Sequence, residues 1–234
     1  MYKIETVLVT KGDRMKQYRL IYENPLQTPE DVAGFITEGN PKISFDGGLV
    51  LTNGDDESLG DYAHFLYWVP QKFPDRIRIE WQFKPLEEPG LCMMFFSAMG
   101  QEKDLFDPSL PERNGYYPQY HSGAIDAYHI SYYRRKYATE RCFETCNLRK
   151  SHGFHLVAQG ADPLPGVADV LEFYQLAIEK DGNHVRFWMN DLLLFSYEED
   201  GAYGPALAEG YIGFRQMAPM KACYKDLKVY QKEE

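Results

Sequence analysis

Residues 126–136 read DAYHISYYRRK and hold an acid, three tyrosines, a histidine, a serine and three cations around one isoleucine. A strand that only fills a core has no need of this mixture. Histidine titrates near neutrality, and we expect an arginine-lined pocket to lower the pKa of a tyrosine, so both types can act as acid or base. Arginine can hold a carboxylate through two parallel N–H bonds. The stretch therefore predicts acid–base chemistry on an anionic ligand, with Tyr128, His129, Tyr132 and Arg134 as catalytic candidates.

The charge around this stretch differs from that of the whole chain. The chain carries a net charge of −10, whereas residues 133–150 hold six cations and two acids, and four of the six histidines fall between residues 121 and 155. The six cations are Arg134, Arg135, Lys136, Arg141, Arg149 and Lys150. A cationic cluster in an acidic protein can concentrate an anionic ligand, whereas a single surface cation more often pairs with an acid elsewhere. We interpret the cluster as a whole as part of a site.

A uronic acid is an anionic ligand that such residues could transform. The proton on the carbon next to its carboxylate is weakly acidic, and neutralising the carboxylate stabilises the enolate-like intermediate. Loss of the oxygen at the β-carbon then gives an unsaturated uronate, by a lyase if that oxygen carries a sugar and by a dehydratase if it is a free hydroxyl. The substrate-binding candidates are His64, Trp68, Arg113, Tyr120, His121, Asp126, Asn147, Arg149, Lys150, Arg215 and Gln216.

Two other functions remain open at this point. A typical glycoside hydrolase needs two carboxylates that face each other across the glycosidic bond. The sequence has no E-x-D-x-x-E-like strand pattern, and Asp126 is the only acid in the candidate strand, but acids from separate strands could converge. A non-catalytic carbohydrate-binding protein would use the 18 Tyr, 14 Phe and 3 Trp as sugar platforms without an acid–base pair.

The elements that must position these residues read as β-strands. Residues 76–85 alternate, with apolar side chains at every second position, whereas residues 91–98 (LCMMFFSA) are apolar on both faces, as in a central strand. Asp181-Gly182 predicts a tight hairpin turn. Residues 101–123 and 160–172 read as long loops. No linker divides the chain, so we expect one domain over residues 1–234 with a ligand cleft on one sheet.

The faces of the 126–136 strand decide which of its residues reach that cleft. Side chains alternate along a strand, so Asp126, Tyr128, Tyr132 and Arg134 share one face. Ile125 and Ala127 make the other face the more core-like at its start. We therefore expect the tyrosines and Arg134 in the cleft, and His129 toward the core unless a β-bulge re-aims it.

Several segments together resemble a known family. The closing strands, at 174–180, 185–189, 210–215 and 224–230, are similar to those of concanavalin A-like lectin and glucanase domains. DLFDPSLPERNGYYPQYHSG, DAYHISYYRR, TCNLRKSHGFHLVAQGADP and GFRQMAP resemble the YesU-like family of domains of unknown function. The resemblance implies an all-β fold, a concanavalin A-like jelly-roll sandwich of two antiparallel sheets, and a setting among bacterial genes for breaking down acidic plant or algal polysaccharides. It brings no catalytic assignment.

Composition narrows the partners further. A pI near 5.1 and the negative charge argue against nucleic acid and against an anionic membrane surface. No apolar run reaches transmembrane length, and residues 1–16 lack a signal-peptide pattern, which predicts a cytoplasmic protein, or a periplasmic one if a signal peptide has been removed. We expect an acidic oligosaccharide as partner and no organic cofactor. The metal and the oligomeric state stay open; jelly rolls of this type sometimes carry a structural calcium, for which no specific ligand motif is found.

Overall fold

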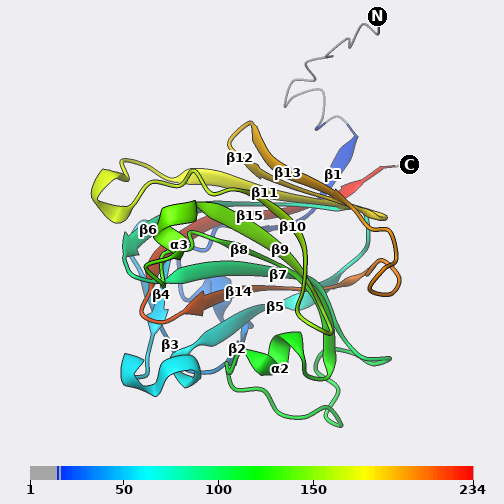
Figure 1. Cartoon of the computed structure of the whole chain (residues 1–234), viewed down its shortest axis with the longest axis horizontal. Helices are drawn as coiled ribbons and strands as arrows, with labels where there is room; N and C mark the ends of the chain where they lie inside the picture. Colours follow the sequence, from blue (N-terminus) through cyan, green and yellow to red (C-terminus); the bar gives the residue numbers. More distant parts are fainter. Residues whose placement is uncertain (1–14, 16, 234) are drawn as a thin grey trace, which may run out of the picture.

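Two antiparallel sheets packed face to face make up the fold, and the predicted sandwich is confirmed (Figure 1). The computed structural model describes residue 15 and residues 17–233. In sheet A the strand order is β13-β12-β11-β6-β15-β4-β3, and β1 pairs with β15. In sheet B the order is β10-β9-β8-β7-β14-β5-β2. Neighbouring strands are distant in sequence in several places, for example β14 between β5 and β7, so the sheets assemble through long-range pairing.

The strands of sheet A are β1 (Tyr18–Asn24), β3 (Pro41–Phe45), β4 (Leu49–Asn53), β6 (Ile77–Glu87), β11 (Tyr174–Asp181), β12 (His184–Met189), β13 (Leu192–Glu198) and β15 (Lys221–Lys232). Those of sheet B are β2 (Ile36–Glu38), β5 (Phe65–Phe73), β7 (Leu91–Gly100), β8 (Ile125–Tyr132), β9 (Thr145–Ser151), β10 (His155–Ala161) and β14 (Gly210–Met217). The short helical turns are η1 (Glu30–Val32), η2 (Glu57–Ala63), α2 (Pro118–His121), α3 (Glu140–Phe143) and η3 (Val167–Asp169).

The strand predictions from alternation and turn residues are confirmed. β11 and β12 form the hairpin expected at Asp181-Gly182, where Gly182 has a φ of 61°, in the left-handed region that glycine enters without strain. Ile79, Trp81 and Phe83 of β6 point from sheet A into the space between the sheets, as the alternation predicts.

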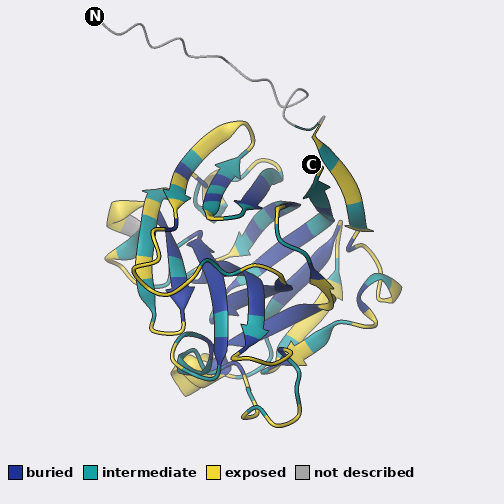
Figure 2. Ribbon diagram, turned by 90° about the vertical axis from the view of Figure 1, so that its right-hand side faces the viewer, coloured by how far each residue is buried: buried dark blue, intermediate teal, exposed yellow. Residues whose placement is uncertain are grey.

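Sheet B is apolar on both faces. Cys92, Met94 and Phe96 of β7 enter the core between the sheets. Met93 and Phe95 point outward into a second apolar cluster. The loop 101–123 closes over that cluster and carries α2 (Figure 1), which explains why β7 is buried on both sides. Buried strands fill the middle of the molecule in Figure 2. This loop is therefore a packed part of the fold.

The expected faces of β8 are wrong. Tyr128 and Tyr132 lie between the sheets, fully buried, whereas His129 and Ser131 lie on the outer face. The physical reason is the second apolar cluster: Ala127 is buried beneath the loop 101–123 and not between the sheets. Apolar residues at the start of a strand thus do not mark which face meets the main core.

Arg134 still reaches the outer side. The alternation breaks at Tyr133, which has a φ of 49° and stays in the core between the sheets. The chain turns there, and the next residue leaves on the same side of sheet B as His129 and Ser131. The position expected for Arg134 is correct, although the alternation used to predict it does not hold.

No helix in the described part of the chain is long and apolar enough to cross a membrane. Of the N-terminal stretch interpreted above, residues 1–14 and 16 lie outside the described residues. The side chain of Arg141, one of the six clustered cations, also lies outside them.

Candidate functional site

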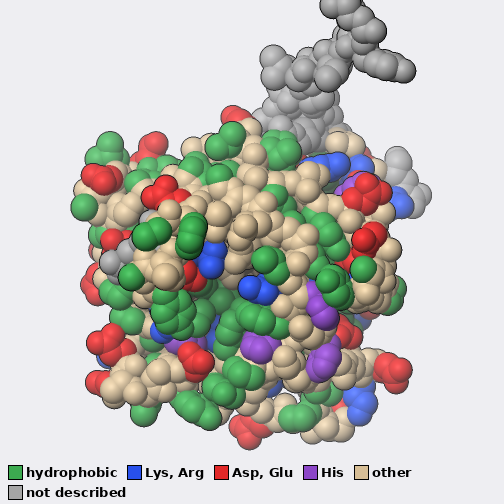
Figure 3. All heavy atoms as spheres, viewed as in Figure 1, with side chains coloured by type: hydrophobic (Ala, Val, Ile, Leu, Met, Phe, Trp, Pro, Cys, Tyr) green, Lys and Arg blue, Asp and Glu red, His purple; other side chains and the backbone are tan. Residues whose placement is uncertain are grey.

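A pocket of about 200 Å³ lies on the outer face of sheet B. It is lined by Asp61, Leu91, Met93, Tyr117, Ser131, Arg134, Tyr137, Glu140, Asn147, Arg149, Phe154 and Met217. Basic, histidine and apolar side chains gather around a hollow in the middle of the view in Figure 3. A hollow of about 440 Å³ at the edge formed by β1 and β15 is larger, but it is lined only by Arg19, Gln231, Lys232 and Glu233 and holds no acid–base pair. The pocket on sheet B is therefore the candidate site.

The register of sheet B builds the floor of this pocket. Arg215 of β14 pairs with Met93 of β7, Met93 with Ser131 of β8, and Ser131 with Asn147 of β9. Directly paired residues point to the same face, so their side chains form one row across four strands. A second row joins Phe95, His129 and Arg149 in the same way. Polar residues from distant parts of the chain thus meet because of strand order alone.

Tyr117, at the start of α2, closes one side of the pocket. Its hydroxyl lies 2.9 Å from Nε2 of His129, whose ring stacks on Phe95 with 4.7 Å between ring centroids. His129 is completely buried, so only Tyr117 of this pair meets a ligand. Burial, with the positive charges of Arg149 and Arg215, lowers the pKa of His129 well below its usual range. Burial raises the pKa of Tyr117, so both residues rest uncharged at neutral pH.

The segment before Tyr117 is fixed by Gly115. The φ of Gly115 is 92°, and a Cβ at this position would lie only 2.0 Å from the carbonyl oxygen of His64. Its N–H donates to the Tyr120 hydroxyl at 2.9 Å, and its carbonyl accepts from Nη2 of Arg215 at 2.9 Å. Only glycine allows this close approach, which holds the loop against sheet B.

Arg149 lines the pocket near Tyr117 and has no carboxylate partner within the described residues. Its Nη1 donates to the Phe154 carbonyl at 3.0 Å, and its guanidinium lies 4.0 Å from the centre of the Phe154 ring. Phe154 belongs to the turn between β9 and β10 and has a φ of 58°. The backbone N–H groups of Gly153 and Phe154 donate to the His121 carbonyl at 2.8 and 3.2 Å, and this ties the turn to α2.

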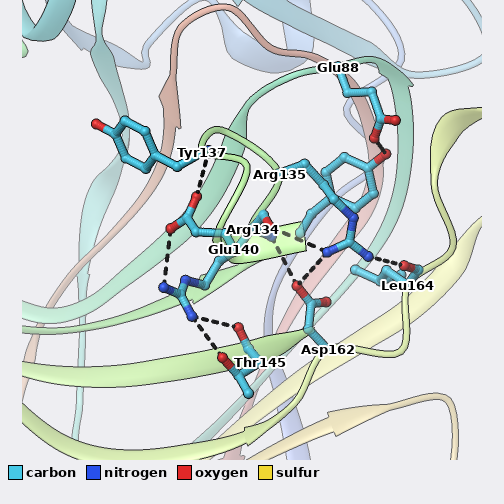
Figure 4. A network of polar contacts seen from close by, with 9 residues as sticks. Glu88, Arg134, Arg135, Tyr137, Glu140, Thr145, Asp162 and Leu164 are labelled. Carbon is cyan, nitrogen blue, oxygen red and sulfur yellow. Dashed lines mark hydrogen bonds and ion pairs between the residues drawn. The ribbon is translucent and has the colours of Figure 1, made fainter. Parts of the chain in front are cut away.

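Arg134 is held by an acid at the mouth of the pocket (Figure 4). Its Nη2 lies 3.1 Å from Oε1 of Glu140, and its Nη1 donates to the carbonyl and the hydroxyl of Thr145 at 3.0 and 2.8 Å. Arg135 turns to the other side, where its Nη1 lies 3.8 Å from Asp162. Only one of these two neighbouring arginines therefore belongs to the pocket.

Arg215 lies beneath the wall of the pocket and is fully buried. Its guanidinium is 4.8 Å from the ring centre of Tyr117 and 4.9 Å from that of Tyr120. Among the described residues its Nε and Nη1 have no hydrogen-bond partner, and no carboxylate lies within ion-pair distance. Burying a guanidinium without a counter-charge is unfavourable in free energy. The positive charge of Arg215 therefore attracts an anionic ligand in the pocket above Tyr117.

Two more histidines flank the site in the uncharged state. Nδ1 of His64 accepts from the Ala218 N–H at 2.9 Å, which places the ring hydrogen on Nε2, 3.2 Å from Asp61. Burial, together with Arg215 and Lys136, lowers its pKa to about 2; the half-exposed Asp61 does not offset this. Burial and the charges of Arg215 and Arg149 lower the pKa of His121 to about 4.

The structure separates the predicted residues into three sets. Arg134, Asn147 and Arg149 line the pocket. Residues that contact its lining are His64, Tyr120, His121, His129 and Arg215. Residues that lie elsewhere are Trp68, Arg113, Asp126, Tyr128, Tyr132, Lys150 and Gln216.

Each residue of the third set makes contacts that explain its position outside the pocket. Tyr128 donates to Glu199 at 2.8 Å, and Lys150 lies 3.0 Å from the same carboxylate, on the inner face of sheet B. The Tyr132 ring packs against three aromatic rings of sheet A. The Gln216 side chain lies between the sheets, 2.8 Å from the Tyr224 hydroxyl.

The other three lie on or near the outer face. Trp68 is buried against Phe95 and Phe106, beneath the loop 101–123. Arg113 forms an ion pair with Glu38 at 2.6 Å. Asp126 accepts from the His152 N–H at 3.2 Å and so supports the turn that carries Phe154.

The tyrosines expected to be acidified show the opposite shift. Burial is the largest cause, and it raises the pKa of Tyr128 and of Tyr132, whose neighbours include no arginine that outweighs it. The expectation of a lowered tyrosine pKa is therefore wrong for both residues. The physical reason is that they lie between the sheets and not among the arginines.

Sequence reasoning missed Tyr117, Phe154, Asp61 and Glu140 as pocket residues. Tyr117 and Phe154 carried a partial signal, because each lies within two residues of a glycine in a loop next to the histidine-rich stretch. Asp61 and Glu140 carried none, since they come from short turns far apart in sequence. Within the described residues no group of three or more His, Cys, Asp or Glu is placed to hold a metal ion.

Comparison with known proteins identifies the family. The model of a domain of unknown function (DUF1961) matches residues 19–229. The chain belongs to the DUF1961 family. The uncharacterized protein YesU of Bacillus subtilis (strain 168) is 52% identical over 219 residues, which cover 92% of this chain and 97% of the relative. The crystal structure of a protein of unknown function with a galectin-like fold from Bacillus subtilis has a TM-score of 0.88 and 51% identity, covering 93% of this chain and all of the other.

More distant structures show how widely the DUF1961 fold occurs. The laminarinase from Rhodothermus marinus has a TM-score of 0.59 at 11% identity, covering 93% of this chain and 98% of the other. The carbohydrate-binding module CBM66 from Bacillus subtilis has a TM-score of 0.51 at 13% identity, covering 86% of this chain and 96% of the other. The fold is thus the predicted jelly roll, shared by carbohydrate-binding modules and glycoside hydrolases. At these identities the likeness shows the fold alone.

Proposed function

We propose that this DUF1961 protein is a carbon–oxygen lyase that acts on a uronic acid unit of an acidic oligosaccharide. One observation carries the proposal: Arg149 and Arg215, neither with a carboxylate partner among the described residues, lie beside the uncharged Tyr117–His129 pair. The fold, shared with carbohydrate-binding modules and glycoside hydrolases, supports a carbohydrate ligand.

The charge of the pocket favours an anionic sugar. Arg134 is balanced by Glu140, but Arg149 donates to one backbone carbonyl and keeps further N–H groups for a ligand. A uronate carboxylate bound to Arg149 would gain charge-assisted hydrogen bonds and supply the missing counter-charge. Asn147 lines the same wall and can bind a sugar hydroxyl.

Tyr117 and His129 supply the proton transfers of a β-elimination. In the proposed reaction the Tyr117 proton moves to Nε2 of His129, and the phenolate oxygen removes the proton from the carbon next to the carboxylate. The phenol gives that proton to the oxygen leaving the β-carbon, while the electron pair of the broken C–H bond forms the new double bond. His129 then returns its proton to Tyr117. The charges of Arg215 and Arg149 favour the phenolate but oppose the protonated His129, so the cycle depends on the substrate carboxylate to supply the counter-charge.

The chemistry needs no organic cofactor, because the arginines neutralise the carboxylate and one tyrosine moves the proton. The size of the pocket, about 200 Å³, is below the roughly 300–1,000 Å³ of sites for drug-sized ligands. It therefore suits one sugar unit. The proposal covers both leaving groups, a second sugar for a lyase and a hydroxyl for a dehydratase.

The deciding experiment is optical. Uronate-containing oligosaccharides are incubated with the protein, and the ultraviolet absorbance of the conjugated product is followed together with product mass. Rising absorbance with chain cleavage indicates a lyase, and rising absorbance with loss of one water indicates a dehydratase. Measurable binding of the oligosaccharides with no product would overturn the enzyme and leave a carbohydrate-binding protein.

A glycoside hydrolase is the second candidate, and one observation favours it. Asp61 and Glu140 both line the pocket and come from separate turns, η2 and α3. New reducing ends without absorbance would support it, and so would complete loss of turnover in both Asp61→Asn and Glu140→Gln. The lyase proposal expects Glu140→Gln to remain active.

A further inference from the structure

Exposed aromatic rings border the mouth of the pocket. Four aromatic side chains of the described residues are large and well exposed: Tyr62, Tyr137, Phe143 and Tyr203. Three of them belong to two segments, residues 57–63 and 137–143, and each segment also contributes an acid to the pocket lining. Single exposed aromatic rings are common, but rings that gather in one place often mark a binding surface, and here three of the four belong to segments that line the site.

Tyr137 stands on one side of the mouth. It lines the pocket yet remains 51% exposed. Its ring points away from the Arg134–Glu140 pair (Figure 4), and its N–H donates to Glu140 at 3.1 Å. The ammonium of Lys136 lies 5.6 Å from the ring centre and is anchored to the Ala218 carbonyl at 2.6 Å. The ring is thus supported by a cation and free to receive a ligand.

Tyr62 and Tyr116 stand on the side of Tyr117 and Asp61. Their rings are stacked in parallel, with 4.6 Å between centroids and 6° between planes. Tyr62 is 57% exposed. Tyr62 follows Asp61 and Tyr116 precedes Tyr117 in sequence, so the stacked pair adjoins two lining residues of the pocket. Stacking on Tyr116 fixes the Tyr62 ring before any ligand binds.

We propose that Tyr137 and the Tyr62–Tyr116 pair form a second sugar-binding subsite, which takes a neutral sugar joined to the uronate in the pocket. The proposal rests on the proposed function, because it assumes a uronate below. The C–H face of a sugar packs against aromatic rings, while the tyrosine hydroxyls and nearby polar groups bind its hydroxyls. Arg149 and Arg215 contact Phe154 and Tyr117, and not Tyr137 or Tyr62, so the subsite offers neither of these arginines to a second carboxylate and suits a neutral sugar.

The test compares the binding of sugars that differ by one unit. The probes are the methyl glycosides of glucuronic and galacturonic acid and the matching disaccharides with glucose, titrated by calorimetry. We expect the wild-type protein to bind a disaccharide about tenfold more tightly than its methyl glycoside, because the added sugar packs on the aromatic rings. Tyr137→Ala and Tyr62→Ala should each remove most of this preference, and Tyr62→Ala, whose side chain does not line the pocket, should leave the methyl glycoside affinity unchanged.

Two controls sharpen the comparison. Tyr137→Phe keeps the ring and should keep the preference. Tyr203→Ala removes an equally exposed tyrosine that stacks on His155, away from the pocket, and should change nothing.

The two proposals fail in different ways. Equal affinity for both sugar lengths, or a preference that survives both alanine variants, overturns the subsite and leaves the uronate pocket standing. A length preference without any turnover supports the subsite and overturns the lyase. No binding of any of the four probes at millimolar concentration overturns both the subsite and the uronate pocket.

Discussion

The Tyr117 hydroxyl lies 2.9 Å from Nε2 of His129, and this contact joins the loop 101–123 to the centre of sheet B. Tyr117 faces the pocket, whereas His129 is completely buried behind it. A ligand therefore reaches the histidine only through the tyrosine. The pair divides two tasks between two residues, since one meets the substrate and the other holds a proton.

Replacing Tyr117 by Phe tests this division directly. The variant keeps the ring above Arg215 but loses the only group of the pair that meets the ligand. Because positioned acid–base groups typically contribute about 10²–10⁴-fold, we expect kcat to fall at least about 100-fold with the affinity for substrate largely kept. Steady-state rates and calorimetric binding measure the two effects. Equal losses of both would show that Tyr117 only binds.

Tyr128→Phe is the matched control, because it removes the same atom from a tyrosine between the sheets. Its hydroxyl donates to Glu199 at 2.8 Å and accepts from the Leu207 N–H at 3.2 Å. We expect unchanged turnover and a loss of about 1–3 kcal/mol in the free energy of unfolding, since a buried carboxylate loses a donor. Urea unfolding measures the stability, and the same assay measures turnover. A loss of activity without a loss of stability would show that Tyr128 takes part in the reaction.

Arg149→Gln should weaken binding of anionic sugars. A charge-assisted hydrogen bond contributes roughly 1.5–3 kcal/mol, so we expect the dissociation constant to rise about 10- to 150-fold. The effect on neutral sugars should be small. Arg76→Gln removes the same charge at an exposed position near Asp181 and serves as the control. Similar losses for acidic and neutral sugars would contradict a carboxylate-binding role.

Glu140→Gln should have the opposite effect. The Glu140 carboxylate lies 3.1 Å from Nη2 of Arg134 and competes with any carboxylate that enters the pocket. Removing its charge leaves Arg134 free, and we expect uronate to bind roughly three- to tenfold more tightly, as for a partly buried ion pair. Titration of a uronate methyl glycoside measures the change. Weaker binding would mean that Glu140 orients Arg134 for the ligand.

His64 should make the fold sensitive to acid. Its pKa in the folded protein is about 2, below the value near 6.5 of an unfolded chain, so between these values the unfolded chain binds a proton that the folded protein does not. Stability is therefore full above pH 6.5 and falls with acidification, by about 2 kcal/mol at pH 5. His64→Asn can still accept from the Ala218 N–H but cannot titrate. Urea midpoints from pH 7 to 5 should fall less steeply in this variant, and parallel slopes would refute the assignment.

Alternation and turn residues were sufficient to predict the strands, whereas the two antiparallel sheets were implied by the family resemblance. The β11–β12 hairpin is one example, because its turn chemistry is local. The faces of β8 were not predictable in this way, since Ala127 is buried by the loop 101–123, whose packing on sheet B is not visible in the strand's own pattern. Local patterns identify a buried side chain but not what buries it.

The site was only partly predictable for a related reason. Arg134, Asn147 and Arg149 lie in the clustered stretch, and cation clustering found them. Arg215 was found from its residue type, yet its place beside Met93 depends on β14 pairing with β7 across more than 100 residues. Lys150 belongs to the same cluster but points to the inner face, because it alternates with Arg149.

The apolar cluster beneath the loop 101–123 has a consequence for selectivity. Because Phe106 packs on Trp68 and Tyr120 on Phe95, the loop is fixed to sheet B, and the wall that carries Tyr117 is assembled when the chain folds and not when a ligand arrives. The conformational entropy of the wall is then lost on folding, so ligand binding does not have to offset it. Such a preformed site selects sugars by their shape at the binding step. A sugar that does not fit is therefore rejected before any proton transfer.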